Sequence, residues 1–369
     1  MNLTKLSFCI ILAASAHGAA SGCTSAIVSA RASASGRPLL WKNRDTSQLD
    51  NKVAYIPAAS GEMAYVALFN ASDRDCAEAW AGMNEAGFAV MNTASYNLND
   101  DSVAAKEMDR EGVLMTLALK HCRTVNDFEE LLTSLPKPLG VEANFGVIDA
   151  CGDGAYFETG NYNFTRFNLE DAESGVLVRT NYSHSGRPGE GFGQIRERNA
   201  WHLLTPHMEQ SAITPALFTE GLSCSFYHDL YGADMLTGSD EWIVDQDFIP
   251  RYTTSASIVI EGVEPVEEST GHEGRDYVMW TKLGYPPCAE VTPVRCDPSG
   301  VMAELQGIDK DGTAPLCNRA LERKREVFSA PDGNRARYVR LPALVNSLGT
   351  GYLTTLRKLN LETYEHYHR

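Results

Sequence analysis

Residues 23–28 read Cys-Thr-Ser-Ala-Ile-Val and begin a run of small and β-branched residues that extends to residue 30. Such a run predicts a β-strand. A turn rich in Ser, Ala and Gly at residues 31–37 leads to a second short apolar strand at 38–43, which Arg44 and Asp45 follow directly. Because the second strand of a hairpin returns beside the start of the first, we expect Asp45 to lie close to Cys23.

The residues before Cys23 have the pattern of a secretory leader. Lys5 is followed by an apolar run at residues 6–14, and Ala20 and Gly22 occupy the −3 and −1 positions of a cut before Cys23. The apolar run is too short to span a bilayer, and no later run reaches the ~18 apolar residues that a spanning helix needs. We therefore expect a signal peptide at residues 1–22 and an exported protein, periplasmic or extracellular, without stable membrane insertion.

A cut before Cys23 would give one residue both a thiol and a free α-amine. The thiol can attack a carbonyl, and an α-amine, whose unperturbed pKa is near ~8, can act as the base. This is the logic of an N-terminal nucleophile. Two other interpretations of Cys23 stay open: an acylated cysteine that anchors a lipid-linked binding protein, although such signals usually carry Leu where this chain has Ala20, or a structural disulfide cysteine.

Composition narrows the class of partner. The chain has 369 residues and a formal net charge of −16, with no basic cluster, which argues against nucleic acid as a partner. No C-x-x-C pair or Cys/His cluster has the spacing of a zinc site, so we expect neither metal nor cofactor. Cys122 and Cys151 lie in apolar surroundings and are expected as buried thiols. Without repeats or a long linker, residues 23–369 are expected to form a single domain; the oligomeric state is left open.

Strand and helix patterns alternate along the rest of the chain in a way that favours an α+β fold with antiparallel sheets. A helix is expected to start at Thr124, whose hydroxyl can cap it together with Asp127. The other expected helices are at residues 112–122, 193–204, 215–222, 225–231 and, with few breaks, from about 314 onward. The expected strands are at residues 63–69, 77–82, 88–92, 144–149, 155–159, 175–181, 255–262 and 288–294.

Several motifs resemble those of the choloylglycine hydrolase and penicillin acylase group. The matches are Cys23-Thr24, then Asn43-x-Asp45, the segment Gly-Met-Asn-Glu-Ala-Gly-Phe at 82–88, and the dipeptide at 180–181. The similarity is greatest to proteins like acyl-coenzyme A:6-aminopenicillanic acid acyltransferase. It implies an N-terminal-nucleophile (Ntn) hydrolase of linear amides. It also implies a four-layer αββα sandwich with two antiparallel sheets.

The same resemblance implies roles for individual residues. Cys23 would be the nucleophile, Asp45 would accept hydrogen bonds from its α-ammonium or thiol, and Asn181 would donate to the oxyanion. Asn92 would line the site or support this hole. The alternatives left open are that Asp45 caps the end of the hairpin and that Asn181 and Asn92 are turn residues at strand ends. The chain departs from the pattern at Lys42, where relatives carry Arg or Gln, and a lysine lacks the planar fork of a guanidinium. Arg44 is the alternative cation for that role.

The predicted function is hydrolysis of an N-acyl amide, with a small molecule as the partner. Three alternatives remain: an acyltransferase on the same scaffold, a dipeptidase with an N-terminal cysteine, and a lipid-anchored binding protein. Neither the acyl group nor the amine can be named from the residues.

Overall fold

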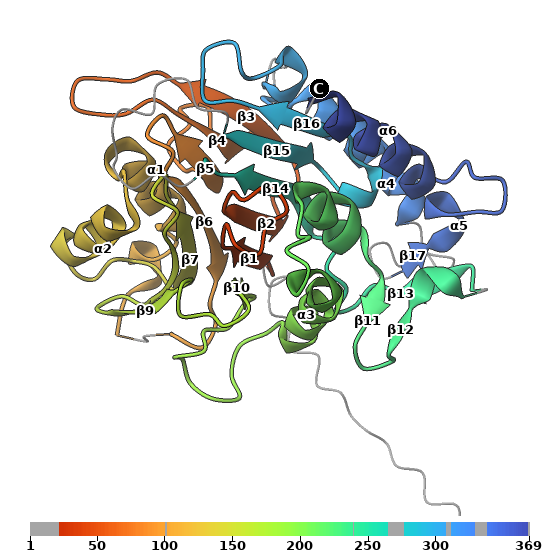
Figure 1. The fold of residues 1–369 in the computed structure, drawn as a ribbon, viewed down its shortest axis with the longest axis horizontal. Coiled ribbons are helices and arrows are strands. Elements are labelled where there is room, and N and C mark those ends of the chain that lie inside the picture. Colours follow the sequence, from red (N-terminus) through yellow and green to blue (C-terminus); the bar gives the residue numbers. More distant parts are fainter. Residues whose placement is uncertain are drawn as a thin grey trace, which may run out of the picture.

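The computed structural model describes residues 22–99, 102–238, 240–264, 277–307, 311–328 and 338–367. The predicted leader therefore lies outside the described residues, apart from Gly22. Two antiparallel sheets form the centre of the molecule, with helices on both sides (Figure 1).

The first sheet has six strands in the order β10-β1-β2-β14-β15-β16. Thr24 pairs with Asn43 in the antiparallel hairpin of β1 and β2, as the sequence predicted. The bounds are β1 Thr24–Val28, β2 Leu39–Asp45, β10 Val176–Arg179, β14 Thr254–Glu261, β15 Val278–Leu283 and β16 Val291–Val294.

The second sheet is a seven-stranded meander in chain order, so each strand pairs with the next along the sequence. Its strands are β3 Asn51–Ile56, β4 Tyr65–Asn70, β5 Ala81–Asn84, β6 Ala89–Ala94, β7 Ala143–Ile148, β8 Gly154–Thr159 and β9 Phe164–Asn168.

Three hydrophobic cores separate four layers. One core lies between the sheets and joins Ile27 and Leu40 of the first to Val66 and Met91 of the second. Another packs α1 (Glu111–His121) and α2 (Val125–Ser134) on the outer face of the second sheet. A third packs α3 (Gln194–Met208) and α6 (Tyr352–Tyr367) on the outer face of the first sheet (Figure 1). Alternating strand residues thus face different cores, and the predicted four-layer αββα sandwich is confirmed.

A further core includes residues of α4, α5 and the small sheet of β13 and β17, and a second small sheet is formed by β11 and β12. The bounds are α4 Pro315–Val327, α5 Leu341–Leu344, β11 Tyr227–His228 with β12 Ala233–Asp234, and β13 Trp242–Val244 with β17 Tyr338–Arg340. Short 3₁₀ or π turns are η1 Ala105–Glu107, η2 Leu217–Gly221, η3 Leu222–Cys224, η4 Met235–Thr237, η5 Pro286–Cys288 and η6 Ala303–Leu305. No helix in these described parts of the chain is long and apolar enough to cross a membrane.

The helices and strands predicted from the sequence agree with the structure to different degrees. The predicted cap of α2 is confirmed, because Thr124 and Asp127 form a reciprocal capping box. The helix predicted at 225–231 is wrong, since β11 begins a hairpin there. The strand predicted at 77–82 begins only at Ala81, and β3, β9 and β15 were not predicted. Cys122 is buried as expected, but Cys151 is exposed because it lies in the turn between β7 and β8.

Candidate active site

Cys23 lies immediately before β1, at the point where the hairpin brings the end of β2 back. Its side chain is buried, with 6% of its surface exposed. The thiol donates a hydrogen bond of 3.7 Å to the backbone carbonyl of Asp45. The predicted meeting of Cys23 and Asp45 is therefore present in the structure.

The Asp45 carboxylate is held through both oxygens. Thr254 Oγ1 donates to Oδ1 at 2.6 Å, and Asn43 Nδ2 lies 3.3 Å from the same oxygen. Arg251 donates to Oδ2 from Nε at 3.1 Å and from its terminal nitrogen at 2.5 Å. Burial is the largest single influence on the pKa of Arg251 and lowers it, but the carboxylates of Asp45, Asp245 and Asp247 together raise this pKa above its usual value. The Asp45 side chain is thus held in place by Arg251, Thr254 and Asn43 together.

A second arginine joins the nucleophile to Asn181. Arg196 is almost fully buried, with 1% of its surface exposed. One of its terminal nitrogens donates to the Cys23 carbonyl at 2.5 Å and to Thr24 Oγ1 at 3.0 Å, and the other donates to Asn181 Oδ1 at 2.7 Å. Burial, reinforced by the charge of Arg251, lowers the pKa of Arg196 to about 9. The predicted pair of Cys23 and Asn181 is therefore brought together by a residue that was not predicted.

Both arginines also hold the residue before Cys23. The carbonyl of Gly22 accepts hydrogen bonds from Arg251 at 2.7 Å and from Arg196 at 3.2 Å. Neither arginine was predicted from the sequence. The sequence gives only weak indications that these two arginines belong to the site. Arg196 follows a glycine-rich loop at the start of a helix, and Arg251 precedes a strand that pairs with β2.

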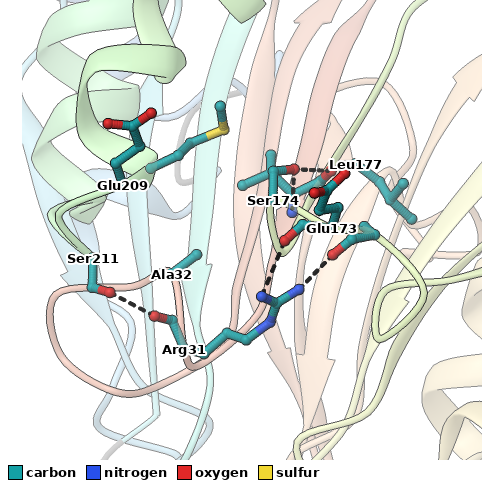
Figure 2. Close-up of a pocket in the computed structure, with 10 residues that line it drawn as sticks. Arg31, Ala32, Glu173, Ser174, Leu177, Glu209 and Ser211 are labelled. Atoms are coloured by element: carbon teal, nitrogen blue, oxygen red, sulfur yellow. Dashed lines mark hydrogen bonds between the residues drawn. The ribbon is translucent and has the colours of Figure 1, made fainter.

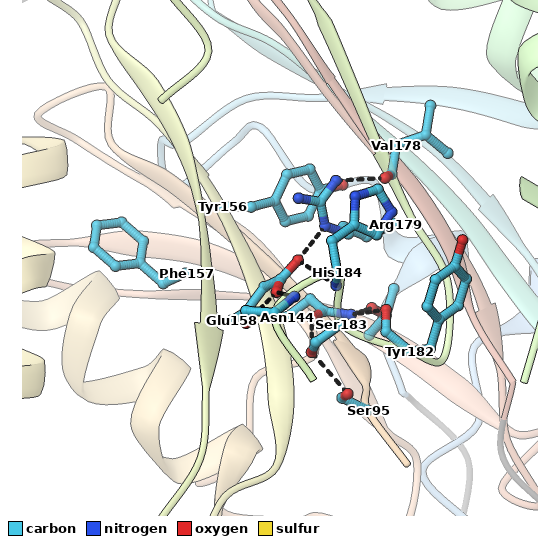
Figure 3. A network of polar contacts seen from close by, with 12 residues as sticks. Ser95, Asn144, Tyr156, Phe157, Glu158, Val178, Arg179, Tyr182, Ser183 and His184 are labelled. Atoms are coloured by element: carbon cyan, nitrogen blue, oxygen red, sulfur yellow. Dashed lines mark hydrogen bonds and ion pairs between the residues drawn. The ribbon is translucent and has the colours of Figure 1, made fainter. Parts of the chain in front are cut away.

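Asn181 follows β10, and its side chain is fully buried. Its amide nitrogen donates to the carbonyl of Ala94 at 2.9 Å. The loop behind it is anchored by a polar network around Ser183, which hydrogen-bonds to Asn144 at 2.6 Å and to Ser95 at 2.8 Å (Figure 3). The bonds to Ala94 and Arg196 fix the Asn181 side chain, and Arg196 links it to Cys23, whereas its role toward an oxyanion remains a prediction.

Lys42 and Asn92 contact each other. Lys42 Nζ donates to Asn92 Oδ1 and to the carbonyl of Trp80, both at 2.7 Å. Burial lowers the pKa of Lys42 to about 7, an effect that a charged Cys23 opposes and Arg44 reinforces. Asn92 is thus a hydrogen-bond partner of the lysine, and its predicted role toward the oxyanion remains a prediction.

Arg44, the alternative cation, connects the first sheet to the second. Its guanidinium donates to Asn51 Oδ1 at 2.6 Å and to Asn70 Oδ1 at 2.8 Å, and it stacks 4.9 Å from the ring centre of Trp80. Burial lowers the pKa of Arg44 to about 10. Among the described residues, the hydrogen bonds given for the Asp45 carboxylate come from Asn43, Thr254 and Arg251. Lys42 and Arg44 are not among these donors.

A hollow of about 320 Å³ adjoins Gly22. Its lining includes Asn181, Arg196 and Arg251, together with Tyr96 and Phe192. These two rings meet edge to face, with centroids 5.5 Å apart. Polar and aromatic side chains therefore line a hollow at Gly22, the residue before the nucleophile, and the hollow has the size of a site for a small molecule.

A larger hollow of about 870 Å³ lies elsewhere, next to the residues that follow the other end of β1 (Figure 2). There Arg31 donates to the carbonyls of Ala172 and Glu173, and Ser211 donates to the Arg31 carbonyl. Five strand residues separate this end from Cys23, a span of about 17 Å at ~3.3 Å per residue. The larger hollow is therefore remote from the nucleophile.

Comparison with models of protein families and with curated proteins gave no match. Among solved structures, an N-acylethanolamine-hydrolyzing acid amidase ortholog from Caenorhabditis elegans is similar, with 13% identity and a TM-score of 0.41, over 67% of this chain and 95% of that one. A variant of conjugated bile acid hydrolase from Clostridium perfringens has 12% identity and a TM-score of 0.45, over 74% and 92%. Penicillin V acylase from Agrobacterium tumefaciens has 13% identity and a TM-score of 0.38, over 74% and 85%.

Proposed function

We propose that this chain is an exported amide hydrolase of the N-terminal-nucleophile type, and that removal of residues 1–22 activates it. The observation that carries the proposal is that groups from distant parts of the chain meet at Cys23. Asp45 reaches Cys23 through the hairpin, and Arg196 ties the Cys23 carbonyl to Asn181. A structural cysteine needs no such arrangement.

The first half of the reaction forms a thioester. The Cys23 α-amine takes the thiol proton as Sγ bonds to the amide carbonyl carbon, which gives a tetrahedral oxyanion. The C–N bond then breaks, and the leaving nitrogen takes the proton from the α-ammonium and departs as an amine. Asp45 holds the α-ammonium in place, and the side chain of Asn181 donates to the oxyanion.

The second half releases the acyl group. Water gives a proton to the α-amine as its oxygen bonds to the thioester carbonyl, and the C–S bond breaks so that the thiol recovers this proton. The product is a carboxylic acid. If an amine attacks in place of water, the acyl group is transferred, which is the outcome that would identify an acyltransferase.

The substrate class we propose is a linear N-acyl amide of small size. The hollow beside Gly22 has a volume suited to one small group, and Tyr96 and Phe192 offer aromatic faces to it. Arg196 and Arg251 keep hydrogen-bond donors at the position of the Gly22 carbonyl, which becomes vacant when the leader is removed.

The test uses protein that begins at Cys23, confirmed by intact mass, and a panel of N-acyl amino acids, other N-acyl amides and free dipeptides. We expect amide cleavage that is lost in Cys23→Ala and in a form that retains Gly22. Cleavage confined to dipeptides would favour a dipeptidase. A diacylglycerol mass on Cys23 would overturn the proposal and favour a lipid-anchored protein.

A further inference from the structure

The helix α4 carries a buried lysine outside the groups that surround the nucleophile. Lys324 is 3% exposed. Its ammonium donates to the backbone carbonyl of Tyr252, and it lies 3.4 Å from the carbonyl of Thr254. The cation is therefore directed at the turn that leads into β14.

Three aromatic rings surround this ammonium. Its distances to the ring centres are 4.6 Å for Tyr252, 5.6 Å for Tyr285 and 5.8 Å for Phe328. Ring faces attract a cation, and the attraction grows when water is excluded. Burial lowers the pKa of Lys324 to about 8, while the Asp245 carboxylate opposes the shift. A long, flexible side chain is thereby confined to one position.

The turn at residues 251–254 is closed by its own hydrogen bonds. Thr254 Oγ1 accepts from the Arg251 backbone N–H at 2.8 Å, and the Thr254 N–H donates to the Arg251 carbonyl at 2.9 Å. The Tyr252 N–H in its middle donates to Asp245 at 2.8 Å. The backbone of the turn is thus held by two side chains: Lys324 of α4 binds its carbonyls, and Asp245 binds its Tyr252 N–H.

The two ends of this turn hold Asp45. Arg251 contacts one carboxylate oxygen and Thr254 the other. Because Thr254 Oγ1 both accepts from Arg251 and donates to Asp45, a shift of the turn moves both contacts together. A displacement of about 1 Å at a reacting group can cost on the order of a hundredfold in rate.

We propose that Lys324 is a positioning residue for Asp45, acting through the 251–254 turn. The inference rests on the proposed function, in which Asp45 holds the α-amine that takes the proton of Cys23. Lys324 itself touches neither the nucleophile nor the substrate. Its contribution is to set the place at which Arg251 and Thr254 meet the carboxylate.

The test compares Lys324→Met with Lys52→Met in protein that begins at Cys23. Lys52 is a suitable control because it is also buried and also donates to a backbone carbonyl, that of Asp73 at 2.6 Å, but it belongs to β3 of the second sheet. The measurements are kcat and KM on an amide found to be cleaved, and the rate at which iodoacetamide alkylates Cys23. The exposed thiol of Cys151 gives the reference rate within the same molecule.

We expect Lys324→Met to lower kcat roughly tenfold to a hundredfold with KM within about twofold, and to slow Cys23 alkylation relative to Cys151. Lys52→Met should leave kcat and the alkylation rate of Cys23 relative to Cys151 unchanged. If Lys324→Met does not fold, Lys324→Arg is the second test, because its planar guanidinium presents its donors in a fixed fork in place of the compact ammonium that the three rings surround. For Lys324→Arg we expect a lower kcat at unchanged KM.

An unchanged kcat and alkylation ratio in a folded Lys324 variant, or equal losses in Lys52→Met, would overturn the inference. The alkylation ratio needs no substrate. If the parent protein cleaves no amide, the proposed function fails, while the ratio still tests whether Lys324 controls the environment of Cys23.

Discussion

Lys42 donates a hydrogen bond of 2.7 Å to Asn92 Oδ1, so that a lysine of the first sheet is held by an asparagine of the second. Burial lowers the pKa of Lys42 from 10.5 to about 7. Between these values the unfolded chain binds a proton that the folded chain does not, so this residue makes stability rise with pH across that window. Below pH 7 its buried charge destabilises the fold most.

The substitution Lys42→Met removes this charge and keeps a chain of similar length. We therefore expect Lys42→Met to raise the free energy of unfolding, relative to the parent, by more at pH 6 than at pH 9. Urea unfolding at both pH values measures it. The same difference at both pH values would mean that Lys42 is charged throughout.

The charge of Lys42 also bears on catalysis, because a nearby cation stabilises a thiolate. The low pKa of Lys42, caused chiefly by burial, predicts that this cation is lost as pH rises through about 7. We expect the parent to show a decline of kcat/KM on the alkaline side that is absent or displaced upward in Lys42→Arg, whose guanidinium stays charged. Superimposable pH profiles would exclude the lysine charge as the cause.

Asp45→Asn should impair both folding and turnover. It leaves the Arg251 guanidinium without its charge partner, a change that typically costs roughly 3 kcal/mol in a buried pair. It also removes the carboxylate that, in the proposed mechanism, holds the Cys23 α-ammonium, and we expect kcat to fall by at least about a hundredfold. The control is Asp149→Asn, because Asp149 is equally buried but binds backbone N–H groups beside the β7–β8 turn. Comparable losses of kcat in both variants would count against a site role for Asp45.

Asn181→Ala tests the oxyanion donor. Loss of such a donor costs about 3 kcal/mol of transition-state stabilisation, or about a hundredfold in kcat, with little change in KM. The control is Asn144→Ala, which removes hydrogen bonds to the carbonyls of Thr180 and Tyr182 on either side of Asn181 but leaves its amide in place. A loss in Asn144→Ala as large as in Asn181→Ala would indicate that loop position, and not the amide, is what matters.

The hairpin of Cys23 and Asp45 was predictable because a short turn determines which ends of two strands meet. The pairing of Thr24 with Asn43 follows from six to eight residues of local pattern on each side of that turn. The four-layer architecture was expected only through resemblance. It is visible afterwards in the way alternate residues such as Ala26 and Ile27 enter different cores.

What could not be predicted depends on contacts between distant segments. Arg196 reaches Cys23 across 173 residues and Arg251 reaches Asp45 across 206, and no local pattern encodes such distances. The strand β15 was missed for a related reason. It carries Lys282 in a fully buried position, where Glu220, distant in sequence, pairs with its charge at 2.8 Å and the carbonyl of Thr219 accepts a further hydrogen bond.

The central claim is that the sulfur of Cys23 becomes acylated when Cys23 is the first residue. The most direct measurement is mass spectrometry of the protein quenched with acid during turnover of a slowly cleaved amide, followed by proteolysis. We predict the acyl mass on the peptide that begins with Cys23, attached through sulfur and removed by hydroxylamine. Turnover without any adduct on that peptide, or undiminished turnover in Cys23→Ala, would contradict the account.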